Sequence, residues 1–532
     1  MTHERDVATG SSVSGGTPAA GGHPTGQAGA GEVGTPSEGV ASSGGRSQRP
    51  SSRAFREFVA SGWGPRPDVR PETGEGARRA VARREALSAR FPGDRLVVPA
   101  GGLQVRSNDT DHRFRPHTAF AYLTGLGGDT EPDCVLVLEP VPGGSGGHEA
   151  VLFFRPRAGR DTEEFYADAR YGELWVGRRA SLAEVEAATG VHARHLDDLP
   201  DAVAKGLGEV VVRVVRDGDP AVTDRLDAER LTHDVDLETA VRLDDDLADA
   251  VSAQRCVKDD WEVEQLREAV AATVRGFEDI ARSLPRAVAH ARGERVIEGV
   301  FAARAREEGN GVGYEVIAAS GEHACTLHWI RNDGEVRADD LVLVDAGVEA
   351  DSLYTADVTR TLPVSGAFSE PQRRVYTAVL DAADAAFAAT RPGATIREVH
   401  QAAMQVLAER LADWGLLPVD AATSLDPQEG GQHRRWMVHG TSHHLGLDVH
   451  DCARLARETY QGQALEAGMV FTIEPGLYFR TDDLLVPEEL RGLGVRIEDD
   501  VLVTADGCEN LSAALPREPD AVEAWLADVQ GR

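Results

Sequence analysis

The sequence predicts a mixed α/β (α+β) protein, and three observations indicate this fold class. Short apolar runs rich in β-branched residues, among them residues 95–98 and 151–154, predict strands. The apolar spacing of residues 255–284 predicts a long helix, and residues 77–91 and 182–188 predict two more. The chain has 532 residues and an apolar content of 41%, which suits a globular protein of two or three domains.

Changes in composition divide the chain into four parts. Residues 1–54 are rich in Gly, Ser, Thr, Ala and Pro and predict a disordered tail, because such a segment cannot bury a core. Residues 55–250 are predicted to form an N-terminal α/β domain, and residues 251–515 a second domain that begins with the long helix. Residues 516–532 are predicted to form a C-terminal tail.

The charge, the cysteines and the lack of long apolar runs indicate which partners and which location to expect. The formal net charge is −32, from 88 acidic and 56 basic side chains, so a phosphate backbone would be repelled and we expect no nucleic-acid partner. The five cysteines form no CxxC pair, and no apolar run approaches the roughly 20 residues of a membrane span. The first residues also lack the pattern of a secretory signal. We therefore expect a cytoplasmic protein without a membrane partner.

Residues 341–364 predict two strands joined by a short connection, and each strand carries one aspartate, Asp345 or Asp357. If the strands pair, the two carboxylates can face each other, and each would resist ionisation unless a cation lies between them. Hard divalent cations prefer such oxygen-rich sites. Taken alone, either aspartate is better explained as a turn residue.

Residues 437–451 hold four histidines, His439, His443, His444 and His450, within twelve positions. Imidazoles at this density indicate a metal or catalytic site. The alternative is a histidine-rich surface loop, which the apolar flanks of the segment disfavour.

Glu474 and Glu498 occupy apolar, β-rich runs, where an unpaired charge is costly. They complete a set of four carboxylates and one imidazole that suits two divalent cations, held by bridging carboxylates and sharing a hydroxide as the nucleophile. The five candidate metal ligands are Asp345, Asp357, His443, Glu474 and Glu498.

The order of these ligands over residues 255–515 resembles that of the pita-bread metallopeptidases, which include methionine aminopeptidase, prolidase, aminopeptidase P and the metal-free creatinase. The segments HGTSHHLGLDVHD, IEPGLYF and VRIEDDVLVT are most similar to aminopeptidase P, and FRPHTAFAYLTG resembles the N-terminal domain of that group. The chain departs from the family in its N-terminal tail, in a slightly longer Asp345–Asp357 connection and in an expanded loop at residues 418–435.

The resemblance implies a C-terminal pita-bread catalytic domain, with a curved antiparallel sheet flanked by helices, preceded by a smaller creatinase-like α/β domain. It implies a metal-dependent aminopeptidase that releases the N-terminal residue from peptides with proline in second position. Two divalent metal ions are implied, with manganese (Mn2+) the usual metal of the group, although the ligand set also suits cobalt, zinc or iron. Dimers or tetramers are common among the relatives.

The resemblance also implies roles for individual residues. Asp357 and Glu498 would bridge both metals, and Asp345 would hold one metal and accept the substrate's α-amino group. His443 and Glu474 would complete the other site, with Glu474 also the general base. Residues implied to bind substrate or to stabilise the tetrahedral intermediate, or to lie near the metals, are His328, His439, His450, Tyr478 and Arg496.

Two alternatives remain open at this point. A prolidase shares the five ligands but acts only on dipeptides. A non-catalytic binding protein on the same fold is the other alternative, although such relatives have lost ligands that this chain keeps.

Overall fold

The computed structural model describes residues 52–141, 143 and 147–531. The tail predicted at residues 1–54 therefore lies almost wholly outside the described residues. Arg49–Arg532 forms one compact unit, so the predicted division at residue 250 stays a prediction.

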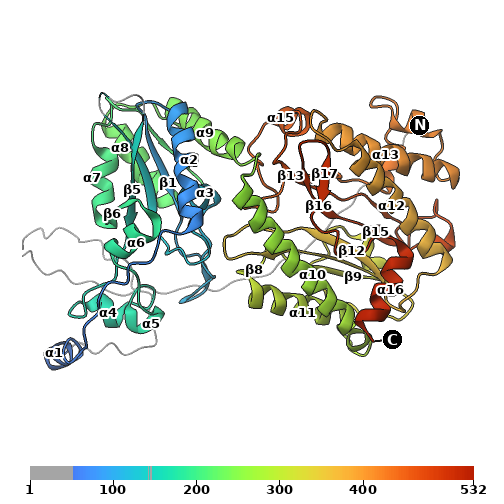
Figure 1. The fold of residues 1–532 in the computed structure, drawn as a ribbon, viewed down its shortest axis with the longest axis horizontal. Helices are drawn as coiled ribbons and strands as arrows, with labels where there is room; N and C mark the ends of the chain where they lie inside the picture. The colour runs from blue at the N-terminus through green and yellow to red at the C-terminus, as the bar shows by residue number, and fades with distance from the viewer. Residues whose placement is uncertain (1–51, 142, 144–146, 532) are drawn as a thin grey trace, which may run out of the picture. The chain divides into compact units, whose positions relative to one another are not determined.

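The N-terminal part is built on a mixed five-stranded sheet in the order β6-β5-β4-β1-β7 (Figure 1). Strand β1 pairs antiparallel with β4 and parallel with β7, so the sheet mixes both kinds of ladder. The strands predicted at residues 95–98 and 151–154 are confirmed as β1 and β5. The strands are β1 (Arg95–Pro99), β4 (Val135–Pro140), β5 (His148–Phe154), β6 (His192–His195) and β7 (Val212–Val214), with a separate hairpin of β2 (Val105–Ser107) and β3 (Thr110–Asp111).

Helices surround this sheet, and those predicted at residues 77–91 and 182–188 are confirmed as α2 and α6. The last helix of the N-terminal part, α9, leads into the C-terminal part through a five-residue connection. The helices are α1 (Arg53–Val59), α2 (Glu75–Arg90), α3 (Thr118–Thr124), α4 (Glu163–Ala167), α5 (Glu173–Val176), α6 (Leu182–Thr189), α7 (Leu199–Ala204), α8 (Pro220–Thr232) and α9 (Leu237–Gln254).

The C-terminal part holds short antiparallel ladders with helices packed around them (Figure 1). The predicted long helix is α10, whose N-terminus Asp259 caps in a reciprocal capping box with Glu262. Helices α10 and α11 pack together, as do α12 and α13. The helices are α10 (Asp260–Val288), α11 (Gly293–Glu308), α12 (Glu370–Ala389), α13 (Ile396–Asp413), α14 (Ala421–Leu425), α15 (Arg457–Gly462) and α16 (Pro519–Val529).

Every strand pairing in the C-terminal part is antiparallel among the described residues, as the resemblance implied. The ladders are β12-β10-β9, β13-β16-β17, β14-β15 and β11-β8. Their strands are β8 (Gly311–Val312), β9 (Ile317–Ser320), β10 (Leu341–Ala346), β11 (Val348–Glu349), β12 (Val358–Pro363), β13 (Val470–Ile473), β14 (Gly476–Tyr478), β15 (Gly494–Arg496), β16 (Asp499–Val503) and β17 (Cys508–Asn510).

Two segments differ from their prediction. The predicted C-terminal tail contains helix α16. Its Val522 and Leu526 share one helix face and are fully buried, because α16 packs against α10 and α12. The predicted loop at residues 418–435 contains helix α14 and a 3₁₀ turn at Gln432–Arg435. Helix α14 and this 3₁₀ turn are short, so tertiary packing rather than intrinsic propensity stabilises them.

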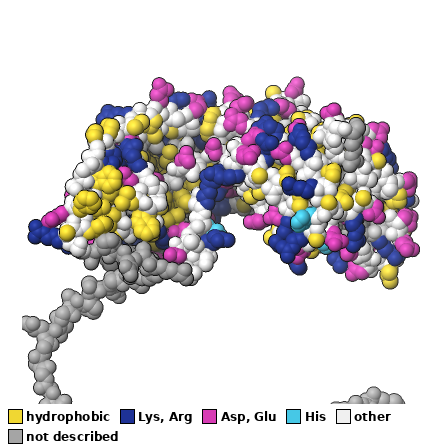
Figure 2. Space-filling model, turned by 90° about the horizontal axis from the view of Figure 1, so that it is seen from below, with side chains coloured by type: hydrophobic (Ala, Val, Ile, Leu, Met, Phe, Trp, Pro, Cys, Tyr) yellow, Lys and Arg dark blue, Asp and Glu magenta, His cyan; other side chains and the backbone are white. Residues whose placement is uncertain are grey.

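Acidic and basic side chains are interspersed over the face shown in Figure 2, so charge of one sign does not collect into a single large patch there. Within the part of the chain that the structure describes, no helix is long and apolar enough to cross a membrane.

Candidate active site

Strands β10 and β12 bring the two predicted aspartates together. In their pairing Asp345 lies opposite Thr359, and Asp357 comes two residues before Thr359, so both aspartates are on one face of the ladder as diagonal neighbours. The connection between the strands closes tightly at Gly347, where a Cβ atom would lie 1.6 Å from the carbonyl oxygen of Ala356. Only glycine fits this close approach.

The two predicted glutamates sit at neighbouring strand ends. Ile473 pairs with Asp499, so Glu474 directly follows β13 where Glu498 directly precedes β16. The Glu498 amide donates a hydrogen bond of 3.1 Å to the carbonyl of Thr359, which joins this strand to β12. The four carboxylates therefore come from a continuous series of adjacent backbone segments.

The histidine segment runs along the other edge of β13. The Thr472 amide donates to the carbonyl of His443, and the Glu474 amide donates to the carbonyl of Thr441, each at 2.9 Å. Extended backbone directs successive side chains to opposite faces, so His443 faces the carboxylates and His444 faces away. Both ring nitrogens of His444 lack a hydrogen-bond partner among the described residues.

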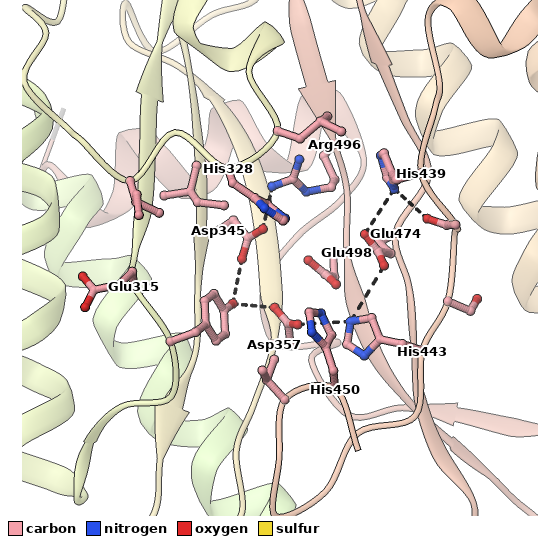
Figure 3. A pocket seen from close by; sticks show the side chains of 17 residues that line it. Glu315, His328, Asp345, Asp357, His439, His443, His450, Glu474, Arg496 and Glu498 are labelled. Carbon is pink, nitrogen blue, oxygen red and sulfur yellow. Dashed lines mark hydrogen bonds and ion pairs between the residues drawn. The ribbon is translucent and has the colours of Figure 1, made fainter. Parts of the chain in front are cut away.

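The five predicted ligands converge, as Figure 3 shows. Ligand atoms of Asp357, His443 and Glu498 all lie within 4.8 Å of one another. His443 Nε2 is 3.4 Å from Asp357 Oδ2 and 3.8 Å from Glu474 Oε1. Asp345 completes the group beside Asp357.

The carboxylates in this cluster are difficult to ionise together. Burial raises the pKa of Glu474 to about 7, although His443 and Arg496 oppose the shift. Burial, together with the neighbouring charge of Asp345, raises the pKa of Asp357, and burial with the charge of Asp357 raises that of Glu498. Positive charge at the centre of the cluster would therefore stabilise the ionised carboxylates.

The pKa of His443 also indicates that the cluster lacks positive charge. Burial by itself would lower its pKa, but the hydrogen bond to Asp357 and the charge of Glu474 raise the pKa to about 9. A proton on the imidazole thus partly neutralises the carboxylates. Divalent cations would replace that proton, because metal ligands bind in their deprotonated forms. Four oxygen donors and one imidazole fit such cations well.

A chain of polar contacts orients Asp345. Arg496 donates from Nη2 to Asp345 Oδ2 at 2.5 Å and from Nη1 to the Tyr478 hydroxyl at 3.0 Å. The Tyr478 hydroxyl lies 2.7 Å from His439 Nε2. Burial, and then the charge of Arg496, lower the pKa of His439 to about 3, so this imidazole is neutral near pH 7.

A cavity of about 480 Å³ opens above the cluster. His328, His439 and His450 line it, and the His450 ring meets the His443 ring edge-on at 4.5 Å between centroids. All the predicted site residues line this cavity except Tyr478, which contacts two of the lining residues from behind.

The sequence did not single out three residues of the site. The Tyr314 hydroxyl contacts carboxylate oxygens of both Asp345 and Asp357. Thr359 donates to Glu498 Oε2 at 2.7 Å, and Glu315 lines the cavity. Their only sequence signal is a place in a β-rich run, which does not distinguish a site residue from a core residue.

Both parts of the chain are similar to known protein families. The family described as metallopeptidase family M24 matches residues 264–505, and the family described as the aminopeptidase P N-terminal domain matches residues 80–212. Xaa-Pro aminopeptidase 1 of Streptomyces coelicolor is 52% identical over 486 residues, which cover 90% of this chain and 93% of the relative. The Xaa-Pro aminopeptidase of Escherichia coli is 33% identical over 84% of this chain and 96% of its own length.

Solved structures show the same likeness. Aminopeptidase P from E. coli in its low-pH form matches with a TM-score of 0.74 and 31% identity, covering 86% of this chain and 99% of that one. The aminopeptidase PepP of Pseudomonas aeruginosa matches with a TM-score of 0.72, also at 31% identity, and covers 86% of this chain and 99% of that one.

The two matched parts and the acid-rich cluster define the class of the protein as a hydrolytic metallopeptidase with a pita-bread catalytic domain and an α/β N-terminal domain. The chain belongs to the aminopeptidase P family, and the two relatives named above are Xaa-Pro aminopeptidases. The predicted family resemblance and the predicted fold class are therefore confirmed.

Proposed function

We propose that the protein is a metal-dependent aminopeptidase that removes the first residue from peptides with proline in second position. The observation that carries this proposal is the convergence of Asp357, His443 and Glu498 within 4.8 Å, in a cavity of about 480 Å³ inside the region matched to family M24. The names of the relatives support the choice of peptide.

The residues that would hold two divalent cations are the five predicted ligands. Asp357 and Glu498 lie centrally and would help to hold both cations, with Asp345 on one side and His443 with Glu474 on the other. Bound cations would supply Lewis acidity and an activated water at neutral pH. We propose manganese as the metal, on the family resemblance.

The chain's own side chains would position the peptide and move the protons. Glu474 is placed to accept a proton from the attacking water, since its carboxylate borders both His443 and the open cavity. Asp345, held by Arg496, would accept the substrate's α-amino group. Such an anchor restricts the enzyme to the first peptide bond.

The three histidines that line the cavity would assist the bond cleavage. His439 is neutral near pH 7 and can donate a hydrogen bond, and His328 and His450 line the same cavity. Donors aimed at the oxygen that becomes negative in the transition state lower the barrier.

We also propose that the protein is a homo-oligomer and that it lies in the cytoplasm, on the family resemblance and the sequence composition.

A metal-depletion assay tests the proposal. The chelated and dialysed protein should lose cleavage of Ala-Pro-Ala and regain it with added Mn2+, Zn2+ or Co2+, while Ala-Ala-Ala stays intact throughout. Cleavage of the dipeptide Ala-Pro but not of the tripeptide would identify a prolidase. Full activity after exhaustive chelation, with residual metal shown absent, would contradict the metal-dependent mechanism.

A further inference from the structure

Glu315 is an acidic side chain of the active-site cavity with no role in the chemistry above. It is exposed, it lines the cavity, and it directly follows Tyr314 in the chain. Figure 3 places Glu315 on the Asp345 side of the site, with Glu474 and His439 on the opposite side. Its carboxylate points away from the metal-ligand cluster.

The Glu315 carboxylate has no hydrogen-bond or ion-pair partner among the described residues. Arg496 is the one arginine or lysine among the described residues that line the cavity, and its guanidinium already bonds Asp345 and Tyr478. No cationic group of the cavity lining is therefore left to neutralise Glu315. A cation from the substrate would meet an unpaired carboxylate here.

The position of Asp345 decides which part of a peptide reaches Glu315. This step rests on the proposed function, in which Asp345 accepts the α-amino group. The side chain of the first residue branches from the carbon that carries this amino group, so it lies on the Asp345 side. The proline and the rest of the peptide extend toward Glu474 and His439.

The lining beside Glu315 suits a long basic side chain. Ile317 follows two residues later, at the start of β9, and both residues line the cavity. Lysine and arginine bury their methylene stems against apolar surface and keep the charged end near water or an acid. An isoleucine beside an exposed carboxylate provides both contacts.

The charge of the whole chain acts in the same direction. A net charge of −32 attracts cationic peptides and raises their rate of encounter, an effect that weakens as ionic strength rises.

We propose that Glu315 is a specificity-determining residue that selects peptides whose first residue is lysine or arginine. Its carboxylate pairs with the basic side chain in the outer part of the cavity. The pair forms equally in the bound substrate and in the transition state, so it lowers KM and leaves kcat nearly unchanged.

The test compares Lys-Pro-Ala with norleucine-Pro-Ala, which has a straight side chain of similar length without the charge. We expect the wild-type enzyme to favour the lysine peptide by up to about fivefold in kcat/KM, the size of an exposed ion pair. Glu315→Gln should bring the ratio to about one by raising KM for the lysine peptide alone, and Glu315→Lys should invert it. About 0.5 M salt should weaken the wild-type preference.

A matched control separates the local charge from the net charge. Glu307→Gln removes one exposed carboxylate from α11, outside the cavity, and should keep the wild-type ratio. Retained cleavage of norleucine-Pro-Ala by Glu315→Gln shows that the variant is folded and active. An unchanged ratio in Glu315→Gln, or no preference in the wild type, overturns the inference. Failure to cleave any Xaa-Pro peptide, Ala-Pro-Ala included, overturns the proposed function instead.

Discussion

His444 should make the protein lose stability in mild acid. The side chain is fully buried, neither ring nitrogen has a partner among the described residues, and the ring packs edge-on against Tyr460 at 4.9 Å between centroids. Burial, and then the nearby charge of Lys258, lower its pKa from 6.5 to about 3. The folded protein therefore keeps this imidazole neutral at pH 5, whereas the unfolded chain protonates it.

The sign and the size of the effect follow from proton linkage. Between pH 6.5 and pH 3 the unfolded chain binds the extra proton, so stability falls as the pH falls through this window. From pH 8 to pH 5 an unfolded histidine with an ordinary pKa gains about 2 kcal/mol from protonation. The folded state gains almost nothing over the same range, so His444 contributes a loss of about 2 kcal/mol in the free energy of unfolding.

The variant His444→Phe keeps a ring against Tyr460 and removes the titrating group. Urea unfolding at pH 8 and pH 5 should show that the variant loses about 2 kcal/mol less than the wild type over this step. The comparison uses the difference between two pH values, so a constant packing change in the variant cancels. His290→Phe, at an exposed position, reports what removing a surface histidine does. An equal pH dependence in wild type and His444→Phe would refute the reasoning.

Three further predictions concern activity. Glu474→Ala should abolish turnover and reduce metal content while the protein stays folded, because removing one carboxylate relieves repulsion in the cluster; near-normal turnover would refute its assignment as a ligand and base. His450→Ala should lower kcat by about 10²–10³ with metal content unchanged, as for a lost oxyanion donor, whereas His443→Ala should lose metal; equal metal loss in both would place His450 among the ligands. A chain that starts at Ser51 should keep the full-length kcat/KM, since α1 begins at Arg53 and the family matches begin at residue 80; a large drop would give residues 1–50 a role in catalysis.

The residue types of the site could be predicted from the sequence because their chemistry conflicts with their surroundings. A carboxylate such as Glu498 inside an apolar strand needs a partner, and histidines at the density of residues 437–451 are rare without a function. The principal strands and helices could be predicted for a related reason, since the periods of two and 3.6 residues record which side of an element is buried. These signals are local, so they are present in the sequence itself.

Contacts between distant segments were decided only by the tertiary structure. Whether Asp345 faced Asp357 directly or diagonally depended on the register of β10 and β12, and a one-residue slip would have turned one of them to the other face. Tyr314 contacts two carboxylates that lie 31 and 43 residues further along the chain. His443 and His444 are neighbours in sequence, yet the pairing of their segment with β13 sends one to the site and the other to the core. Register and strand pairing depend on the packing of the whole chain, and local residue patterns do not record them.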